Sequence, residues 1–298
     1  MIQCHISTKK GLIIRPFCVV FNNFVETTSW LYSTQSDYMC LILFSWQQHP
    51  KYKLVLAANR DEFYQRPTLA AGFWPDDKQL MAGRDLTAGG TWIGMHRSGK
   101  FAALTNYRDP HNIDPAAISR GELTTNYLKN EMDPLSYLEL LKRSEKKYNG
   151  FNLMVGDTDH LHYYNNVNHE IESLTTGSFG LSNGFFQENW PKLKKGRDLL
   201  EAKVTENDIE PDTLFDILED RQRAEDQELP KTGIPIDWER ALSSLFIETE
   251  EYGTRCSTLI YLDYDNNVRF IEKTHDVGGQ TASLNEYEFK LEVKMTQR

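Results

Sequence analysis

Apolar residues fall into short runs that pair across turns along most of this chain. Residues 41–46 and 52–58 are two such runs, joined by Gln47-Gln48-His49-Pro50-Lys51, and this pattern predicts a β-hairpin. Three further pairs of runs have the same form, at residues 91–95 and 101–105, 151–155 and 161–164, and 259–262 and 268–272. Repeated hairpins indicate mainly antiparallel sheet, because parallel strands need long crossover connections.

The helical spacing of apolar residues occurs between these hairpins. Asp133-Pro134 supplies an N-cap acid and a first-turn proline, so we predict a helix from there to about residue 148. Further helices are predicted at residues 191–204, 211–224 and 237–246. Hairpins with helices grouped on the outer faces predict an α+β sandwich of four layers, in the order helices, sheet, sheet, helices.

Composition narrows the class of protein. Of 298 residues, 40% are apolar and 26% are charged, which is ordinary for a globular protein and too apolar for a disordered one. No apolar run reaches the roughly 18 residues that a membrane span requires. The net charge of −10 argues against nucleic-acid binding, which requires a basic surface. Four cysteines in so long a chain do not form a disulfide scaffold, so we expect a reducing, cytoplasmic location.

The negative charge is concentrated in one segment. Residues 197–252 hold 17 acidic and six basic side chains, a net charge of −11, so the rest of the chain is close to neutral. We interpret this segment as a solvated helical face rather than a docking site for a basic partner.

Residues 1–38 follow none of these patterns. Phe17-Cys18-Val19-Val20-Phe21 is followed at once by Asn22-Asn23, so the uninterrupted apolar stretch of a signal peptide is missing. A transit peptide is rich in arginine, and this stretch has one. We interpret residues 1–38 as an extension that arises from a start codon placed too early, a propeptide or a weak targeting peptide. Residues 39–298 are then expected to form a single domain.

Cys40 is the first candidate for chemistry. If the working chain starts at Met39 and loses that methionine, Cys40 carries a thiol with a pKa near ~8.5 and an α-amine with a pKa near ~7.7–8.0. The amine can then take the thiol proton, so that one residue supplies both nucleophile and base. With residues 1–39 attached, Cys40 has no α-amine and this mechanism cannot operate. The alternative for Cys40 is a small buried residue at the head of a core strand.

A polar tetrad, Asn59-Arg60-Asp61-Glu62, follows the apolar run at residues 54–58. The end of a rigid strand is a frequent place for a functional site. Arg60 can orient a thiolate or bind a substrate carbonyl or carboxylate, and Asp61 can anchor the α-amine of Cys40. Glu62 is expected to be structural, and the alternative for the whole tetrad is an ordinary charged turn.

Three further polar residues complete the candidate site. Asn106 ends a predicted strand and Asn183 precedes a glycine, and each can donate its amide to an oxyanion or act as a turn residue. Arg255 lies just before a predicted strand and is either a second cation of the site or a surface residue. His160 and His162 share one face of a strand but lack a third ligand, so we expect no metal site.

These segments together resemble the NRDE family, which is also the family of transport and Golgi organization protein 2. The resemblance covers the chain from Met39 to about Leu291. Its nine blocks, in order, are Met39-Cys40, Asn59-Arg60-Asp61-Glu62-Phe63-Tyr64 with Arg66-Pro67, Gly89-Gly90-Thr91-Trp92-Ile93-Gly94, Ala103-Leu104-Thr105-Asn106, Arg120-Gly121-Glu122-Leu123, Asn149-Gly150-Phe151-Asn152-Leu153, Gly180-Leu181-Ser182-Asn183, Trp190-Pro191-Lys192 and Tyr252-Gly253-Thr254-Arg255.

The resemblance implies the four-layer fold of N-terminal-nucleophile hydrolases. Within that superfamily, the choloylglycine and penicillin-V acylases use an N-terminal cysteine to attack a non-peptide amide, surrounded by an arginine, an aspartate, two asparagines and a further arginine. The residues of this chain in the matching order, for which the resemblance implies a catalytic role, are Cys40, Arg60, Asp61, Asn106, Asn183 and Arg255. Members of the NRDE family itself are linked to Golgi organisation, haem trafficking and lipid or coenzyme A metabolism.

Two functions therefore stay open. The first is a cysteine amidohydrolase that cleaves the C–N bond of an N-acyl amide in a small-molecule substrate, with Cys40 as the nucleophile and no cofactor. The second is a non-enzymatic protein on a hydrolase-like fold that binds haem or an acyl lipid through Cys40 or a histidine. The haem-attachment motif C-x-x-C-H is absent from the sequence. A purely structural role would leave the polar cluster at the strand ends unexplained.

Overall fold

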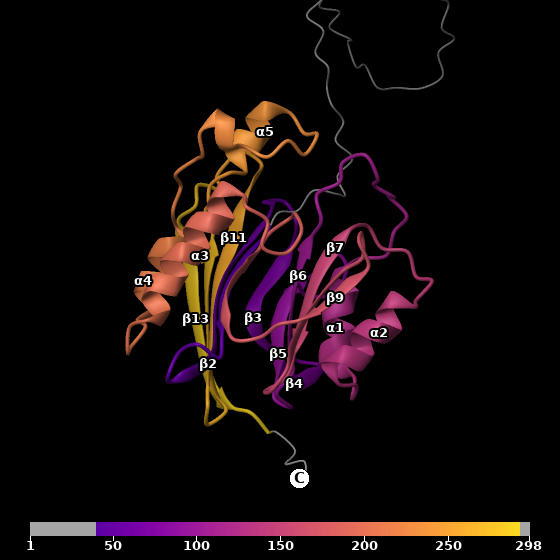
Figure 1. Cartoon of the computed structure of the whole chain (residues 1–298), viewed down its shortest axis with the longest axis vertical. Coiled ribbons are helices and arrows are strands. Elements are labelled where there is room, and N and C mark those ends of the chain that lie inside the picture. Colours follow the sequence, from indigo (N-terminus) through magenta and orange to yellow (C-terminus); the bar gives the residue numbers. More distant parts are fainter. Residues whose placement is uncertain (1–39, 293–298) are drawn as a thin grey trace, which may run out of the picture. The chain divides into compact units, whose positions relative to one another are not determined.

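Two antiparallel β-sheets face each other in the computed structural model, which describes residues 40–292 (Figure 1). Our interpretation of residues 1–38 as an extension lies outside the described residues. Within that range, the first sheet has six strands in the spatial order β10-β1-β2-β11-β12-β13. Their bounds are β1 (Cys40–Trp46), β2 (Tyr52–Phe63), β10 (Gly177–Leu181), β11 (Tyr252–Asp263), β12 (Asn267–His275) and β13 (Thr281–Lys290).

The second sheet has seven strands within the described part of the chain, in the spatial order β3-β4-β5-β6-β7-β8-β9. Their bounds are β3 (Thr68–Trp74), β4 (Asp77–Asp85), β5 (Ile93–His96), β6 (Phe101–Asn106), β7 (Phe151–Gly156), β8 (Leu161–Asn165) and β9 (Glu170–Ser173). Neighbouring strands pair antiparallel throughout both sheets.

The predicted hairpins are confirmed as β1–β2, β5–β6, β7–β8 and β11–β12. Several strands that the sequence does not predict are poorly buried. Most residues of β9 and β13 are exposed or half-buried, as are most of β3. β3 and β9 lack the clear alternation of apolar and polar residues that marks a strand in the sequence. β13 does alternate, with Tyr287 and Phe289 between Glu286, Glu288 and Lys290, so its sequence carries a strand signal that the prediction missed.

Helices cover the outer face of each sheet, which confirms the four-layer α+β sandwich. α3 (Pro191–Val204) and α4 (Pro211–Leu218) pack on the first sheet, and α1 (Gly121–Lys129) and α2 (Pro134–Lys142) pack on the second (Figure 1). The short 3₁₀ helix η1 (Asp226–Glu228) and α5 (Ile236–Ala241) belong to the connection between α4 and β11. No helix within residues 40–292 is long and apolar enough to cross a membrane.

The helix predicted at residues 191–204 is confirmed at both ends, whereas the other predicted helices end earlier than expected. α2 ends at Lys142 because the residues that follow, Arg143-Ser144-Glu145-Lys146-Lys147, are polar and offer no apolar face to bury. α4 ends at Leu218, where the chain leaves the helix and the carbonyl oxygen of Asp220 accepts from the backbone N–H of Phe246 at 2.9 Å. α5 likewise ends at Ala241.

The sequence does not predict α1, because its first residue, Gly121, is a poor helix former. The close approach of two backbones explains a neighbouring glycine. A Cβ atom on Gly90 would lie 2.6 Å from the carbonyl oxygen of Gly121, which is too close for any side chain. Glycine at position 90 therefore lets the entry to β5 pack against the start of α1.

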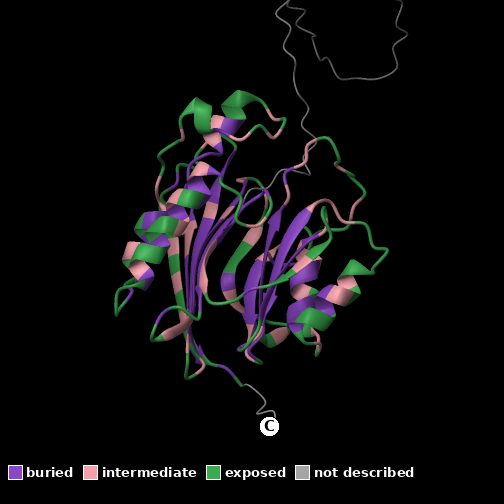
Figure 2. Ribbon diagram, viewed as in Figure 1, coloured by how far each residue is buried: buried purple, intermediate pink, exposed green. Residues whose placement is uncertain are grey.

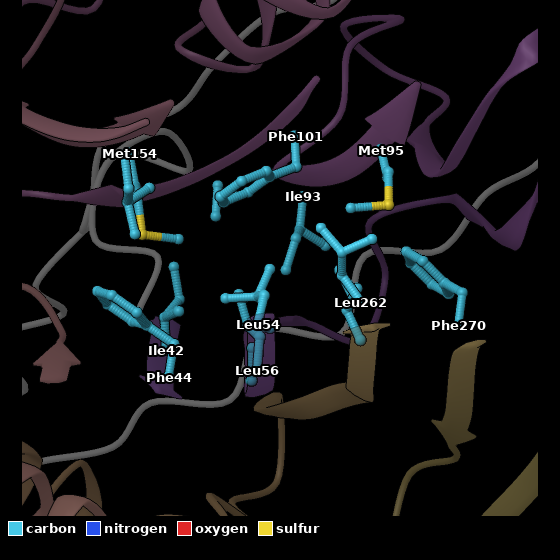
Figure 3. Packing of buried hydrophobic residues seen from close by; sticks show 14 of the residues in the cluster. Ile42, Phe44, Leu54, Leu56, Ile93, Met95, Phe101, Met154, Leu262 and Phe270 are labelled. Carbon is cyan, nitrogen blue, oxygen red and sulfur yellow. The ribbon is translucent and has the colours of Figure 1, made fainter. Parts of the chain in front are cut away.

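The central core fills the space between the two sheets (Figure 3). Ile42 and Leu56 from the first sheet pack in one cluster with Met95, Phe101 and Met154 from the second, and each is at most 1% exposed. Complete burial of a side chain of this size contributes about 1.5–3 kcal/mol. Separate apolar clusters lie between each sheet and its helices, so buried residues occur in all four layers (Figure 2).

Candidate functional site

A cavity of about 620 Å³ lies between the two sheets and is lined by residues of both. Small-molecule sites usually have volumes of about 300–1,000 Å³. Five of the six candidate residues line this cavity: Cys40, Arg60, Asp61, Asn106 and Arg255. The sixth, Asn183, forms a hydrogen bond with Cys40. The structure thus brings together all six candidates from separate segments of the chain.

The strand register places three cavity side chains in a row across the first sheet. Cys40 on β1 lies opposite Arg60 on β2, and Arg60 in turn lies opposite Cys256 on β11. Residues that lie directly opposite each other project from the same face of a sheet. Cys40, Arg60 and Cys256 therefore share the face that lines the cavity.

Asn59 precedes Arg60 on β2 and projects from the opposite face, toward the helices. Its Nδ2 donates to the carbonyl oxygens of Leu218, at 2.8 Å, and Leu245, at 2.9 Å. Ser257 Oγ donates to Asn59 Oδ1 at 2.6 Å. The first residue of the tetrad therefore holds the end of α4 and the segment after α5 against the sheet.

Cys40 begins β1 and is 6% exposed. Its backbone N–H donates to Asn183 Oδ1 at 3.3 Å, and its carbonyl oxygen accepts from Ser182 Oγ at 3.0 Å. Burial and, after it, the negative charge of Asp61 raise the pKa of the thiol to about 12, although Arg60 opposes the rise. The thiol is therefore protonated at neutral pH and needs a base before it can act as a nucleophile.

Asp61 is completely buried, and its backbone lies close enough to the Cys40 sulfur to favour the thiolate, against the effect of burial on the pKa of the thiol. Its Oδ1 accepts from Thr254 Oγ1 at 2.6 Å, whereas its Oδ2 has no hydrogen-bond partner among the described residues. Burial raises the pKa of this carboxyl group to about 7, and the charge of Lys192 is the strongest influence in the opposite direction. A buried polar atom without a partner costs about 1–3 kcal/mol, so Oδ2 of Asp61 requires an explanation.

The two candidate asparagines differ in the hydrogen bonds that their side chains form. Asn183 is 1% exposed; its Oδ1 accepts from Cys40, and its Nδ2 donates to the carbonyl oxygen of Asn106 at 2.9 Å. Asn106 ends β6 and lines the cavity, and its side-chain amide forms no hydrogen bond with another residue of the described chain. The amide of Asn106 is thus available to a ligand, while that of Asn183 is engaged with the protein.

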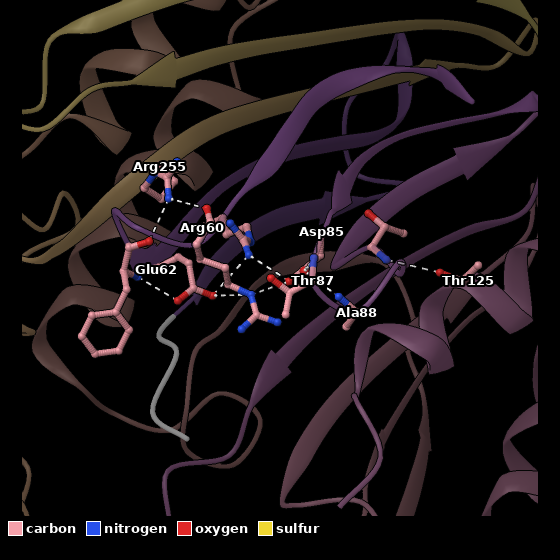
Figure 4. A network of polar contacts seen from close by, with 10 residues as sticks. Arg60, Glu62, Asp85, Thr87, Ala88, Thr125 and Arg255 are labelled. Atoms are coloured by element: carbon pink, nitrogen blue, oxygen red, sulfur yellow. Dashed lines mark hydrogen bonds and ion pairs between the residues drawn. The ribbon is translucent and has the colours of Figure 1, made fainter. Parts of the chain in front are cut away.

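An ion-pair network holds Arg60 at the cavity wall (Figure 4). Arg60 Nη2 lies 3.2 Å from Glu62 Oε2 and 3.6 Å from Asp85 Oδ2. Arg66 Nε lies 2.6 Å from Asp85 Oδ2 and 3.5 Å from Glu62 Oε2. Glu62 is 1% exposed, and burial raises its pKa to about 7 although both arginines oppose the rise. Glu62 and Asp85 together fix the guanidinium of Arg60 on the strand opposite Cys40.

A β-bulge sets the direction of Arg255. The pairing between β11 and β2 shifts register between Thr254 and Cys256, and a bulge of this kind turns the extra residue to a new direction. Nη1 of Arg255 donates to the carbonyl oxygens of Phe63, at 2.8 Å, and Arg66, at 3.1 Å (Figure 4). Arg255 forms no ion pair with any residue in the range 40–292, although the negative charge of Glu62 acts on its guanidinium at the cavity.

Residues 39–276 match the family model described as Transport and Golgi organisation 2. The chain belongs to this family. The Transport and Golgi organization 2 homolog of Mus musculus is 36% identical over 276 residues, which cover 85% of this chain and 100% of the mouse protein. Transport and Golgi organization protein 2 of Drosophila melanogaster is 31% identical over 263 residues, which cover 79% of this chain and 92% of the fly protein.

One solved structure similar to this Transport and Golgi organisation 2 family member is a mutant of the conjugated bile acid hydrolase from Clostridium perfringens. The similarity has a TM-score of 0.43 at 10% identity, and it covers 88% of this chain and 99% of the hydrolase. A likeness this distant establishes neither an activity nor a substrate for the family member.

Lys192 is a buried residue of the family member that the sequence does not single out. It is the second residue of α3 and is 3% exposed, and its Nζ has no hydrogen-bond partner among the described residues. Burial lowers its pKa to about 8, and the charge of Asp61 opposes this most strongly. The signal that would have found it is the spacing of four to Gly196 and Leu200, which places Lys192 on the buried stripe of α3.

Side chains of the kinds that bind metal ions do not cluster in the described part of this chain. Residues 40–292 contain no group of three or more histidine, cysteine, aspartate or glutamate side chains that could hold a metal ion. His162 Nδ1 lies 3.0 Å from Ser173 Oγ, and its ring stacks beside that of His160 with centroids 6.4 Å apart.

Proposed function

We propose that this protein is a cysteine amidohydrolase that cleaves the C–N bond of an N-acyl amide in a small-molecule substrate. Cys40 is the nucleophile, and the working chain begins at Cys40 so that its α-amine is free. The observation that carries the proposal is the setting of Cys40 at the cavity. Its nitrogen is held by Asn183, and the unpaired oxygen of the Asp61 carboxyl group belongs to the neighbouring strand.

In the proposed reaction, the α-amine of Cys40 takes the thiol proton and the thiolate attacks the amide carbonyl carbon. The C–N bond then breaks, and the protonated α-amine gives its proton to the leaving amine. The acyl group is now a thioester on Cys40. A water molecule, deprotonated by the same α-amine, hydrolyses the thioester to a carboxylic acid, and the thiol is restored.

The surrounding side chains support distinct parts of this reaction. The free amide of Asn106 can donate to the oxyanion that forms when the carbonyl carbon is attacked. Oδ2 of Asp61 can accept a hydrogen bond from the α-amine, which would satisfy the unpaired oxygen. Arg60 and Arg255 supply positive charge at the cavity, where a thiolate or a substrate carboxylate would be stabilised.

A carrier of haem or of an acyl lipid is the second function that the sequence leaves open. Sites for such ligands are lined predominantly by apolar and aromatic side chains. This cavity is instead lined by several ionic side chains, among them Arg60, Glu62, Arg66, Asp85 and Arg255. The charged lining favours a polar amide substrate over haem or a lipid.

Two mass measurements test the proposal. The intact mass of the natively expressed protein is expected to match a chain that begins at Cys40. That protein is then incubated with a panel of N-acyl amides, and peptide mass spectrometry is expected to locate an acyl adduct on Cys40. Cys40→Ala should abolish the adduct, and Cys40→Ser should slow or abolish turnover because a hydroxyl is a weaker nucleophile at neutral pH.

Cys256→Ala is the matched control, because Cys256 is a second buried cysteine that lines the same cavity. It should leave the Cys40 adduct in place. A mass that begins at Met1, or the absence of an adduct on Cys40 with every substrate of the panel, would count against the hydrolase. Tight binding of haem or an acyl lipid by the same protein, lost in Cys40→Ala and without turnover, would instead favour a carrier.

A further inference from the structure

Lys192 lies in a setting that is unfavourable for a cation in three respects. Its side chain is 3% exposed, and its Nζ has no hydrogen-bond partner among residues 40–292. It also lies in the first turn of α3, where the helix dipole disfavours positive charge. A buried amine in such a place is retained only if a nearby negative charge compensates it.

Only one of the described acidic groups around Lys192 is available to compensate its positive charge. The groups that influence it are Asp61 on β2, Cys40 on β1, Glu239 on α5 and the cation Arg108 after β6. Glu239 is already engaged, because its Oε2 lies 2.6 Å from Arg108 Nη1 and its Oε1 accepts from Thr232 at 2.6 Å. The thiol of Cys40 is protonated at neutral pH, since burial raises its pKa to about 12. Asp61 projects from β2 on the same face as Asn59, toward the helices, and its charge acts on Lys192 more strongly than that of any other acid.

Asp61, for its part, has no cation among the described residues that is paired with it alone. Its Oδ1 accepts from Thr254, but the cation on its own strand, Arg60, is paired with Glu62 and Asp85. Among the groups that lower the pKa of Asp61, the charge of Lys192 comes first, ahead of Thr254 and Arg60. Lys192 on α3 and Asp61 on β2 are therefore buried groups of opposite charge that interact electrostatically. Nζ of Lys192 and Oδ2 of Asp61 both lack a hydrogen-bond partner in the described chain.

We propose that Lys192 is a positioning residue, whose ammonium group keeps the carboxyl group of Asp61 ionised so that Oδ2 can anchor the α-amine of Cys40. This inference rests on the proposed function for the role of the α-amine, but the coupling of Lys192 to Asp61 does not. An ionised Asp61 orients the amine toward the thiol, whereas a protonated Asp61 would hold it more weakly. Lys192 itself need not touch the substrate.

The coupling can be measured in the full chain without any substrate. Infrared difference spectra taken across a pH titration contain a protonated-carboxyl band for Asp61, identified because it is lost in Asp61→Asn. In the wild-type protein this band is expected to titrate near pH 7. Lys192→Met and Lys192→Gln should move its midpoint up by about one to three pH units, because the opposite charge that favours the carboxylate is removed.

Two further variants are the controls. Lys192→Arg keeps the charge and should return the midpoint toward that of the wild type. Lys194→Met removes a charge from an exposed position on the same turn of α3 and should leave the midpoint unchanged. A midpoint that does not move in either neutral variant would overturn the inference.

If both neutral variants fail to fold, a double variant decides the question. Asp61→Asn added to Lys192→Met removes the uncompensated buried carboxylate and is expected to restore folding. A double variant that is no more stable than Lys192→Met would overturn the coupling. The proposed function fails separately: a shifted midpoint in a protein that never forms an acyl adduct on Cys40 would reject the hydrolase and keep the coupling.

Discussion

The backbone N–H of Cys40 donates to the side-chain oxygen of Asn183, which lies 143 positions further along the chain, at 3.3 Å. The same asparagine donates its amide to the carbonyl oxygen of Asn106. Asn183 therefore joins the start of β1 in the first sheet to the end of β6 in the second. Its side chain is occupied by this connection, and Asn106 is left with a free amide at the cavity.

This arrangement predicts different effects for two similar substitutions. Asn106→Ala removes a donor to the oxyanion and should reduce the rate of acylation of Cys40 about 10²–10³-fold, with little change in stability. Asn183→Ala leaves the N–H of Cys40 and the carbonyl oxygen of Asn106 without a partner, so the free energy of unfolding should also fall by about 1–3 kcal/mol. Urea unfolding and acylation rates measure both effects. An equal loss of stability in the two variants would contradict the assignment.

The raised pKa of the Cys40 thiol predicts how the state of its nitrogen controls reactivity. With a peptide bond before Cys40, the thiol has a pKa of about 12 and should react slowly with iodoacetamide near neutral pH. In a chain that begins at Cys40, reactivity should rise as the α-amine loses its proton near pH ~8. Peptide mass spectrometry compares the two forms, with Cys256 as the internal reference. Identical pH profiles for Cys40 in both forms would show that the α-amine is not its base.

The confirmed hairpins were predictable because their strands are buried and their turns are short, as in β1 and β2. The exposed strand β9 was not predictable, because a strand without a buried face has no marked alternation. Helix α1 was not predicted because it begins with Gly121, and glycine is a poor helix former. A Cβ atom on Gly121 would lie 3.3 Å from the carbonyl oxygen of Thr91, so this glycine belongs to the tight contact between α1 and the entry to β5.

The candidate site shows a different limit. Residue type and the family resemblance single out Asn106 and Asn183 but do not separate them, because their roles depend on contacts between distant segments. Lys192 was missed for a related reason: a lysine in an amphipathic helix is usually solvated, and only its tertiary setting shows that it is buried. Glu239 in the acidic segment is a third case, because it is 3% exposed and paired rather than solvated.

Glu62 predicts a pH dependence of stability. Burial raises its pKa from 4.5 to about 7 in the folded protein. Between these values the folded state binds a proton that the unfolded state does not, so the free energy of unfolding should fall as pH rises, by about 1.4 kcal/mol per pH unit. Glu62→Gln removes this contribution. Urea unfolding of both proteins from pH 4.5 to 7 should give a shallower decline for the variant, and parallel curves would contradict the assignment.

The ion pair between Arg108 and Glu239 predicts a large cost for single substitutions. Both side chains are buried, at 3% and 4% exposure, and the guanidinium also lies over the ring of Trp190, 4.7 Å from its centroid. Removal of one partner leaves an uncompensated buried charge, so Arg108→Met or Glu239→Gln should lower the free energy of unfolding by about 3–5 kcal/mol. The double variant Arg108→Met with Glu239→Leu should lose less than the sum, because no charge is left unpaired.

The control for that ion pair is Arg240, which follows Glu239 on α5. Arg240 forms ion pairs with Asp226 and Asp237 at the surface, so Arg240→Met should change stability little. Arg108 also donates its backbone N–H to the carbonyl oxygen of Asn183 at 2.7 Å and follows Asn106 by two residues. Loss of the ion pair should therefore reduce the rate of acylation of Cys40 as well as the free energy of unfolding, whereas Arg240→Met should change neither. If Arg108→Met retains the wild-type acylation rate, the buried pair stabilises the fold without positioning the asparagines.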